Sequence, residues 1–213
     1  KHCNGAFQDE RHVLIFDDAK KRLEESPDEH YDVIILDLAD PVDGGPCYQL
    51  YTDSFYEMCR RKLTKDGVLV TQSGPCGHLS AHEVFSPIHA TLRKVFPGAT
   101  YMSSTLVTSF MDDYGFNTVL NNASGTINPM AVTPEEIDRR IEERIEGGAS
   151  ALQWYDGITH QRLFHLAKSI RQLCERETRV ITKDNYVFMV NANTPMRKDE
   201  ENGEVEGEAG TEE

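Results

Sequence analysis

Two aspartates at one end of an apolar run are the residues best placed to do chemistry. Asp37 and Asp40 follow the run in the segment DVIILDLADPVDGGP, residues 32–46. Ligands of open α/β sheets bind at the carboxyl ends of strands, where Asp37 would lie. Pro41 disfavours helical backbone at Asp40, which favours projection of that side chain out of the loop. Paired carboxylates repel each other unless a cation lies between them, so the pair indicates a cationic ligand. The alternative is that Asp37 caps a turn.

The overall charge is compatible with a cationic ligand. The 213 residues include 36 acidic and 22 basic side chains, which gives a formal net charge of −14. Binding to nucleic acid requires clustered Lys and Arg, so this balance argues against a nucleic-acid partner. An acidic surface suits a cationic substrate, although many proteins are acidic for solubility alone.

The sequence favours a cytoplasmic location. No apolar run approaches the roughly 18 to 20 residues that cross a bilayer, and no basic-then-apolar signal begins the chain. The five cysteines are dispersed without a C-x-x-C pair, which is typical of free thiols in a reducing compartment. We therefore expect a cytoplasmic protein with neither a membrane partner nor structural disulfides.

Metal binding and thiol chemistry are less favoured interpretations. His78 and His82 are four residues apart, but the H-E-x-x-H arrangement is absent and no cysteine lies at ligand spacing. We interpret both histidines as surface or capping residues and expect no metal site. Cys76 lies in a Gly-Pro-Cys-Gly loop without an evident His–acid partner, so we expect it to pack within that loop.

The elements that must position the aspartates alternate between strand and helix along the first 120 residues. The run YDVIIL at Tyr31–Leu36 is rich in β-branched residues, which predicts a strand buried on both faces of a parallel sheet. The other expected strands span residues 12–16, 68–72, 100–107 and 114–120. The expected helices span residues 18–25, 52–63 and 80–95, the last with a capping box at Ser80 and a kink or break at Pro87. This alternation predicts a doubly wound α/β sheet.

The pattern changes after residue 122. Pro134–Ile145 is predicted to be an amphipathic helix, and Ile158–Glu177 a second helix with an apolar stripe. Residues 180–190 are consistent with one or two strands. From residue 194 onward almost nothing is apolar, so we expect a disordered acidic tail over residues 194–213.

Several segments in order resemble one enzyme family. They are DDAKKRL from residue 17, VIILDLADP from 33, GGPCYQLYTDSFY from 44, VTQSGPCG from 70, EVFSPIHATLRKVFP from 83, SFMDDYGF from 109 and EIDRRIEERI from 136. Together they resemble the polyamine aminopropyltransferases (the spermidine/spermine synthase family). The Leu-Ala-Asp-Pro spelling resembles the thermospermine-synthase, ACAULIS-like branch more than ordinary spermidine synthases. The resemblance covers roughly residues 1 to 180.

The resemblance implies a fold as well as an activity. The family has a Rossmann-like sheet of the S-adenosylmethionine-methyltransferase type, with strand order 3-2-1-4-5-7-6. This chain would hold only the carboxyl-terminal portion of that α/β domain (residues 1–130), then a helical extension (131–193) and the acidic tail (194–213). Residues 12–16 would be the third strand, without its usual neighbours and next to an exposed sheet edge.

The family transfers an aminopropyl group from decarboxylated S-adenosylmethionine to an amine and releases methylthioadenosine. Spermidine would become thermospermine or spermine, with decarboxylated S-adenosylmethionine as co-substrate and no separate cofactor. A polyamine nitrogen is an ammonium near neutral pH, because alkylamines titrate near ~10, and a carboxylate must accept its proton before attack. The resemblance assigns seven residues: the proton acceptor Asp37, the ammonium anchor Asp40, the amine-binding Gln72 and Phe110, and the nucleoside-binding Asp18, Ala19 and Pro46.

The sequence departs from the family pattern in two ways. The family's small β-rich domain and its Gly-rich loop precede the third strand, and neither is found here, since the sequence starts at Lys1. We therefore expect this chain alone not to bind the nucleoside properly. Relatives commonly dimerise through that preceding part, which leaves a homodimer open for the full-length protein. Tyr114-Gly115-Phe116 also replaces the Trp-Gly-Trp of many plant-type relatives, which bears on the choice of acceptor.

Two alternative functions remain at this point. One is an S-adenosylmethionine-dependent methyltransferase, which shares the fold but would normally carry an Asn-Pro-Pro-Tyr or comparable loop after the fourth strand. The other is a truncated, inactive fragment that is stable only with a partner.

Overall fold

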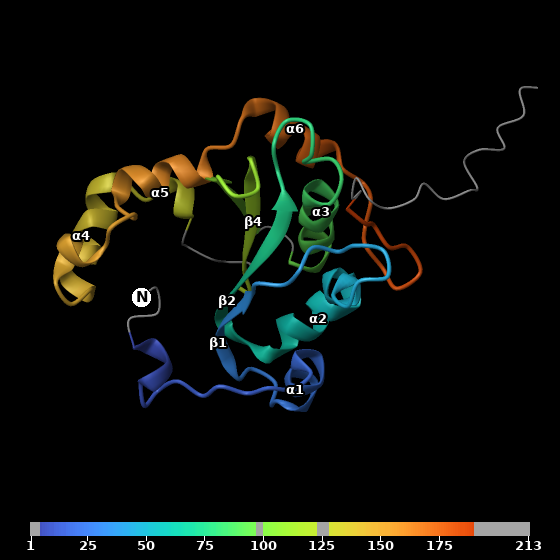
Figure 1. Ribbon diagram of the computed structural model, residues 1–213, viewed down its shortest axis with the longest axis horizontal. Helices are drawn as coiled ribbons and strands as arrows, with labels where there is room; N and C mark the ends of the chain where they lie inside the picture. The colour runs from blue at the N-terminus through green and yellow to red at the C-terminus, as the bar shows by residue number, and fades with distance from the viewer. Residues whose placement is uncertain (1–4, 97–99, 123–127, 190–213) are drawn as a thin grey trace, which may run out of the picture.

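A four-stranded mixed sheet forms the centre of the molecule (Figure 1). The computed structural model describes residues 5–96, 100–122 and 128–189. In spatial order the strands are β1 (Tyr31–Leu36), β2 (Leu63–Pro75), β4 (Asp112–Leu120) and β3 (Thr100–Val107). β1 is parallel to β2, and β4 is antiparallel to both β2 and β3. In the family order 3-2-1-4-5-7-6, these four strands correspond in turn to strands 4, 5, 7 and 6. The α/β fold class is confirmed.

Helices cover one face of the sheet. α2 (Asp53–Lys62) and α3 (Phe85–Val95) pack on each other and on β2, and α6 (Lys168–Arg176) packs against α3. The main core lies between these helices and the sheet, with Tyr51, Tyr56, Leu69, Ile88 and Leu92 fully buried. Figure 1 shows α2 and α3 on the same side of the strands.

The expected helix over residues 52–63 is present as α2. Its N-cap is Thr52, whose Oγ1 accepts a hydrogen bond of 3.4 Å from the backbone N–H of Phe55. Such a cap satisfies one of the donors left free at a helix start. α1 (Ala19–Glu25) begins after Asp18 and packs beside α2.

The expectation that Tyr31–Leu36 is buried on both faces is wrong for the described chain. Ile34 and Leu36 face the core, whereas Val33 is 54% exposed and Ile35 72% exposed. Successive side chains of a strand point to opposite faces, so Val33 and Ile35 point away from the face of β1 on which Ile34 and Leu36 pack in the core. β1 is also an edge strand, because it pairs with β2 alone.

The strand expected over residues 12–16 does not form. The segment has no strand pairing, and Val13, Leu14, Ile15 and Phe16 are all more than half exposed. A strand needs a neighbour to satisfy its backbone N–H and C=O groups, and the described chain supplies none at this position. The family strand order implied an exposed sheet edge, and the described sheet has one at β1, which pairs with β2 on one side only.

The predicted helix over residues 80–95 begins later than expected. α3 starts at Phe85, and Ser80 does not cap it, because its Oγ donates to Asp112 Oδ2 at 2.6 Å instead. Pro87 therefore lies in the first turn of α3, where a missing N–H costs nothing, and it neither kinks nor splits the helix.

The carboxyl-terminal part contains more breaks than the sequence indicated. α4 (Pro134–Arg144) agrees with prediction, but the helix expected over 158–177 is divided into α5 (Gly157–Phe164) and α6. No strand forms over the described part of residues 180–190, which ends at Met189. The segment contains a single isolated β-bridge, between Thr182 and Asn185. The described residues also form four short 3-10 helices: Ala6–Gln8, Tyr48–Tyr51, Pro129–Ala131 and Gly148–Ala151. The predicted tail, residues 194–213, lies outside the described residues, and the division at residue 130 stays a prediction.

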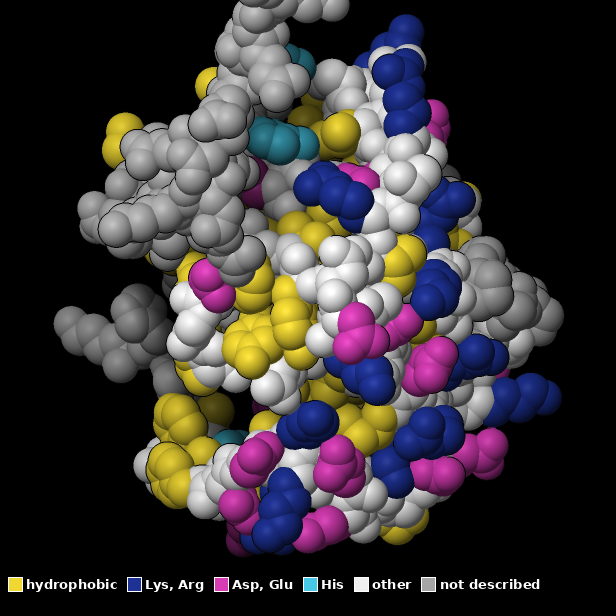
Figure 2. All heavy atoms as spheres, turned by 90° about the vertical axis from the view of Figure 1, so that its right-hand side faces the viewer, with side chains coloured by type: hydrophobic (Ala, Val, Ile, Leu, Met, Phe, Trp, Pro, Cys, Tyr) yellow, Lys and Arg dark blue, Asp and Glu magenta, His cyan; other side chains and the backbone are white. Residues whose placement is uncertain are grey.

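Charged groups of both signs share the surface. Figure 2 shows one face of the molecule, on which described Lys and Arg side chains lie among Asp and Glu side chains. Within the described residues, every helix is too short or too polar to span a bilayer.

Candidate functional site

The two aspartates lie at the carboxyl end of β1, at the edge of a hollow of about 410 Å³. Four polar side chains line this hollow: Asp37, Asp40, Gln72 and Tyr114. Its apolar walls come from Leu38, Val107, Phe110 and Phe116. Gln72 comes from the end of β2 because β1 and β2 are parallel neighbours, with Leu36 opposite Thr71.

Asp40 is held by a donor on each of its oxygens. Gln72 Nε2 donates to Oδ1 at 2.6 Å, and Tyr114 Oη donates to Oδ2 at 3.1 Å. The Gln72 amide is itself oriented, because its Oε1 accepts a hydrogen bond of 2.8 Å from the backbone N–H of Gly74. A carboxylate offers about four lone-pair directions, so Asp40 retains acceptor capacity for a cation.

Asp37 has a different environment. Its side chain is exposed and accepts no hydrogen bond from any described residue. The turn-capping alternative is therefore not what the described chain forms. Asp37 is free to accept a proton or a hydrogen bond from a ligand in the hollow, whereas Asp40 is already committed to two protein donors.

Two tyrosines to which the sequence analysis assigned no contact with the aspartates interact with this segment. Tyr51 is buried, and its Oη donates to the carbonyl oxygen of Ala39 at 3.1 Å, which ties down the loop between the two aspartates. Burial, followed by the charge of Asp40, raises the pKa of Tyr51. Burial and Asp40 likewise raise the pKa of Tyr114 to about 12. Both phenols are therefore neutral donors at physiological pH.

Phe110 forms the outer wall of the hollow. It lies in the turn between β3 and β4, is 60% exposed, and its ring centroid is 4.7 Å from that of Tyr114. The hollow thus has two carboxylates among aromatic and aliphatic side chains. An aliphatic ammonium would match both, since methylenes favour burial and a cation is attracted to an aromatic face.

The three residues assigned to the nucleoside are not among those that line this hollow. Asp18 is the N-cap of α1, with Oδ1 accepting from the Lys21 backbone N–H at 3.1 Å. Ala19 lines a separate hollow of about 210 Å³, and Pro46 is exposed in the loop after β1. The structure therefore gathers Asp37, Asp40, Gln72 and Phe110 but leaves the nucleoside assignment a prediction.

The histidines and Cys76 do not form a second chemical site. His78 is within 3.3 Å of Ser169 Oγ, whereas His89 is buried against Asn117. The described part of the chain contains no group of three or more His, Cys, Asp or Glu side chains placed to hold a metal. Cys76 is buried in a small apolar cluster, and burial raises the pKa of its thiol to about 12, so it is a poor nucleophile at neutral pH.

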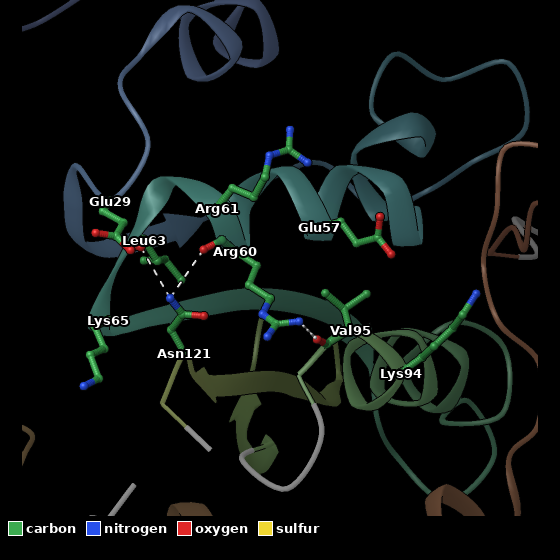
Figure 3. Close-up of a pocket in the computed structure, with 9 residues that line it drawn as sticks. All are labelled: Glu29, Glu57, Arg60, Arg61, Leu63, Lys65, Lys94, Val95 and Asn121. Atoms are coloured by element: carbon green, nitrogen blue, oxygen red, sulfur yellow. Dashed lines mark hydrogen bonds between the residues drawn. The ribbon is translucent and has the colours of Figure 1, made fainter. Parts of the chain in front are cut away.

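A larger hollow, of about 560 Å³, opens at the other end of β2 (Figure 3). Its charged lining consists of Glu29, Glu57, Arg60, Arg61, Lys65 and Lys94. Figure 3 shows Arg61 and Lys65 pointing away from one another, and Arg60 donates to the Val95 carbonyl oxygen at 3.1 Å. Because these groups do not converge on a common point, the smaller hollow beside the aspartates is the better candidate site.

Comparison with known proteins places the chain in a family. A family model described as the spermine/spermidine synthase domain matches residues 1–127. The thermospermine synthase ACAULIS5 of Arabidopsis thaliana is 38% identical over 187 residues, which cover 87% of this chain and 52% of that protein. A polyamine aminopropyltransferase of Sulfurisphaera tokodaii is 36% identical over 183 residues, covering 86% of this chain and 57% of that protein. The chain thus spans about half the length of the curated relatives it matches.

Solved structures agree on the fold. A spermidine synthase from Thermotoga maritima superposes with a TM-score of 0.63 at 19% identity, covering 81% of this chain and 53% of that one. A spermidine synthase in complex with the transition-state analogue AdoDATO gives 0.62 at 18% identity, covering 80% and 51%. At such low identity the likeness establishes the methyltransferase-like fold alone. Taken with the match over residues 1–127, these findings show that the chain belongs to the spermine/spermidine synthase family.

Proposed function

We propose that this chain carries the amine-binding and proton-accepting side chains of a polyamine aminopropyltransferase. The reaction would move an aminopropyl group from decarboxylated S-adenosylmethionine to spermidine, giving thermospermine or spermine and releasing methylthioadenosine. The proposal depends on the difference between the two aspartates at the end of β1. Asp37 accepts no hydrogen bond from a described residue, whereas Asp40 accepts hydrogen bonds from Gln72 and Tyr114.

The chemistry requires two carboxylates with different tasks. A polyamine ammonium has no lone pair, so it must lose a proton before its nitrogen attacks the carbon next to the sulfonium. The new C–N bond forms as the C–S bond breaks, and the electron pair of that bond stays on sulfur as a neutral thioether. One carboxylate must take the proton while the other keeps the polyamine in place.

The contacts of the aspartates favour a division of these tasks. Asp37 has no donor on its oxygens among the described residues, so its lone pairs are available to the reacting nitrogen. Asp40 already accepts from Gln72 and Tyr114, which fixes the orientation of its carboxylate. We assign the proton acceptor to Asp37, the anchor to Asp40, and the contact with the polyamine methylenes to Phe110.

The remaining assignments follow from the same proposal. Decarboxylated S-adenosylmethionine would be the co-substrate, with its nucleoside near Asp18, Ala19 and Pro46. A net charge of −14 supports a cationic partner over nucleic acid, and four free thiols among the described cysteines support a cytoplasmic location. Homodimerisation of a longer protein remains compatible with this assignment.

Calorimetric titration of the chain with spermidine tests the amine site without relying on the nucleoside. We expect Asp40→Asn to weaken spermidine binding at least tenfold, because a charge-assisted contact contributes about 1.5–3 kcal/mol. Asp184→Asn is the matched control, since Asp184 is exposed and distant in sequence from the site. Spermidine binding that is absent, or equal in all three proteins, contradicts the proposal.

An assay of aminopropyl transfer separates the two aspartates. In a longer protein that also carries the family's Gly-rich loop, assayed with decarboxylated S-adenosylmethionine and spermidine, Asp37→Asn should lower turnover about 10²-fold or more, because it removes the general base. Asp37→Asn should weaken spermidine binding less than Asp40→Asn does. Unchanged turnover in Asp37→Asn would remove that residue from the role of proton acceptor, and chromatography of the products distinguishes thermospermine from spermine.

A further inference from the structure

We propose that Tyr114 is a positioning residue for the amine site, whose hydroxyl fixes the Asp40 carboxylate in the orientation that receives an ammonium. This inference rests on the proposed function, because it assumes that Asp40 anchors a polyamine. It concerns a side chain that spacing along the sequence does not connect with the aspartates, since 74 residues separate Tyr114 from Asp40.

The backbone holds Tyr114 rigidly in place. It lies on β4, opposite Thr105 of β3 and Pro75 of β2, so strands flank it on both sides. Its side chain is half-buried, and its ring packs on Phe110 at 4.7 Å with an interplanar angle of 41°. The hydroxyl at the end of this ring reaches Asp40 Oδ2 at 3.1 Å.

The Tyr114 hydroxyl is one of two donors that together fix the Asp40 carboxylate. Gln72 Nε2 binds Oδ1 at 2.6 Å, so the two carboxylate oxygens are held from different elements, β2 and β4. With Gln72 alone, the carboxylate could rotate about its single bond and still keep one contact. With both donors, its orientation is set before a ligand arrives, and binding avoids the cost of ordering it.

Tyr114 is suited to act as a permanent donor. Burial and the adjacent Asp40 charge keep its pKa about 12, so the phenol stays neutral over the range in which polyamines are cations. A phenolate would repel Asp40 instead of binding it. The other carboxylate acting on Tyr114 is Asp112, which also favours the neutral phenol.

A double-mutant cycle on spermidine binding tests whether Tyr114 acts through Asp40. Tyr114→Phe keeps the ring on Phe110 but removes the hydroxyl, and we expect the spermidine Kd to rise about tenfold. In the Asp40→Asn background the same substitution should change Kd less than twofold, because the group it positions is already gone. Tyr48→Phe is the matched control, since the Tyr48 hydroxyl accepts from the exposed Gln49 and from no other residue in the described part of the chain.

Steady-state kinetics provide the second measurement. In a longer protein that also carries the family's Gly-rich loop, loss of the Tyr114 hydroxyl in Tyr114→Phe should raise KM for spermidine about tenfold and leave kcat within about twofold. Loss of fold would lower kcat as well, and a thermal melt of the variant monitors that loss directly.

The outcomes distinguish the two proposals. If wild-type protein binds spermidine and Asp40→Asn weakens binding, but Tyr114→Phe costs nothing or costs the same in both backgrounds, the Tyr114 inference is wrong. If Asp40→Asn has no effect on binding, the proposed function itself is wrong. A Tyr114→Phe effect confined to the background with an intact Asp40 supports the inference.

Discussion

Gln72 Nε2 lies 2.6 Å from Asp40 Oδ1, a short hydrogen bond that joins the carboxyl end of β2 to the loop after β1. On its other side, the same amide accepts the backbone N–H of Gly74 at 2.8 Å. Gln72 therefore links the conformation of the strand end to the orientation of the proposed anchor. The amide can serve both partners because it carries a donor and an acceptor.

Replacing Gln72 by Met should affect both stability and binding. The N–H of Gly74, a buried residue, would lose its acceptor, so we expect the free energy of unfolding to fall by about 1–3 kcal/mol. Spermidine affinity should fall too, because Asp40 loses its donor on Oδ1. Urea denaturation and calorimetry measure the two effects. The control is Gln49→Met, which alters an exposed amide, and equal stability of the two variants would contradict this prediction.

Removal of the Phe110 ring should affect binding alone. Phe110 is 60% exposed, so Phe110→Ala removes little buried area and should leave the melting temperature unchanged. Loss of the aromatic wall should raise the spermidine Kd by about two- to fivefold, given that a cation–π contact contributes about 0.5–1 kcal/mol. The control is Met111→Ala in the same turn, which changes a side chain that is 90% exposed. Similar Kd values for both variants would exclude Phe110 from the site.

The ionisation of Tyr114 should report on Asp40. Burial is the largest cause of its raised pKa of about 12, and the charge and hydrogen bond of Asp40 come next. In Asp40→Asn we expect this pKa to fall toward 10 without reaching it, because the burial remains. NMR of ring-labelled tyrosine across an alkaline titration measures the change, with Tyr114→Phe identifying the signal. An unchanged pKa would show that the two groups do not interact in solution.

His89 should make stability depend on pH. Its Nδ1 lies 2.7 Å from Asn117 Oδ1, and Asn117 Nδ2 donates to Ser73 Oγ at 2.9 Å, so His89 must be the donor in its own bond. Burial lowers the pKa of His89 below 6.5, and the nearby Arg93 acts in the same direction. The unfolded chain therefore binds the proton at a higher pH than the native protein does.

The sign of the effect follows from that difference. The contribution of His89 to stability is fully present above pH 6.5 and is lost as the pH falls toward its lower native pKa. We expect urea denaturation to give a smaller free energy of unfolding at pH 5.5 than at pH 7.5, with a smaller difference in His89→Gln. His82→Gln, at an exposed position, should keep the wild-type difference. Identical pH dependence in both variants would assign it to other groups.

The sequence by itself singled out Asp37 and Asp40, and the family resemblance added Gln72. Each ends or directly follows an apolar run, and the carboxyl ends of neighbouring parallel strands meet at one edge of a sheet. Their proximity therefore required only the pairing of β1 with β2. The family resemblance added Phe110, which the turn between β3 and β4 brings to the same hollow.

Only the tertiary structure decided which aspartate is held and which is free. That difference depends on Tyr114 reaching Asp40 across 74 residues, and it arises because β4 inserts antiparallel between β2 and β3. The tertiary structure also decided the fate of residues 12–16, whose apolar pattern is that of a strand. A local pattern records which side chains favour burial, but hydrogen-bond partners and covering helices come from distant segments, so pairing and burial are settled only when the whole chain packs.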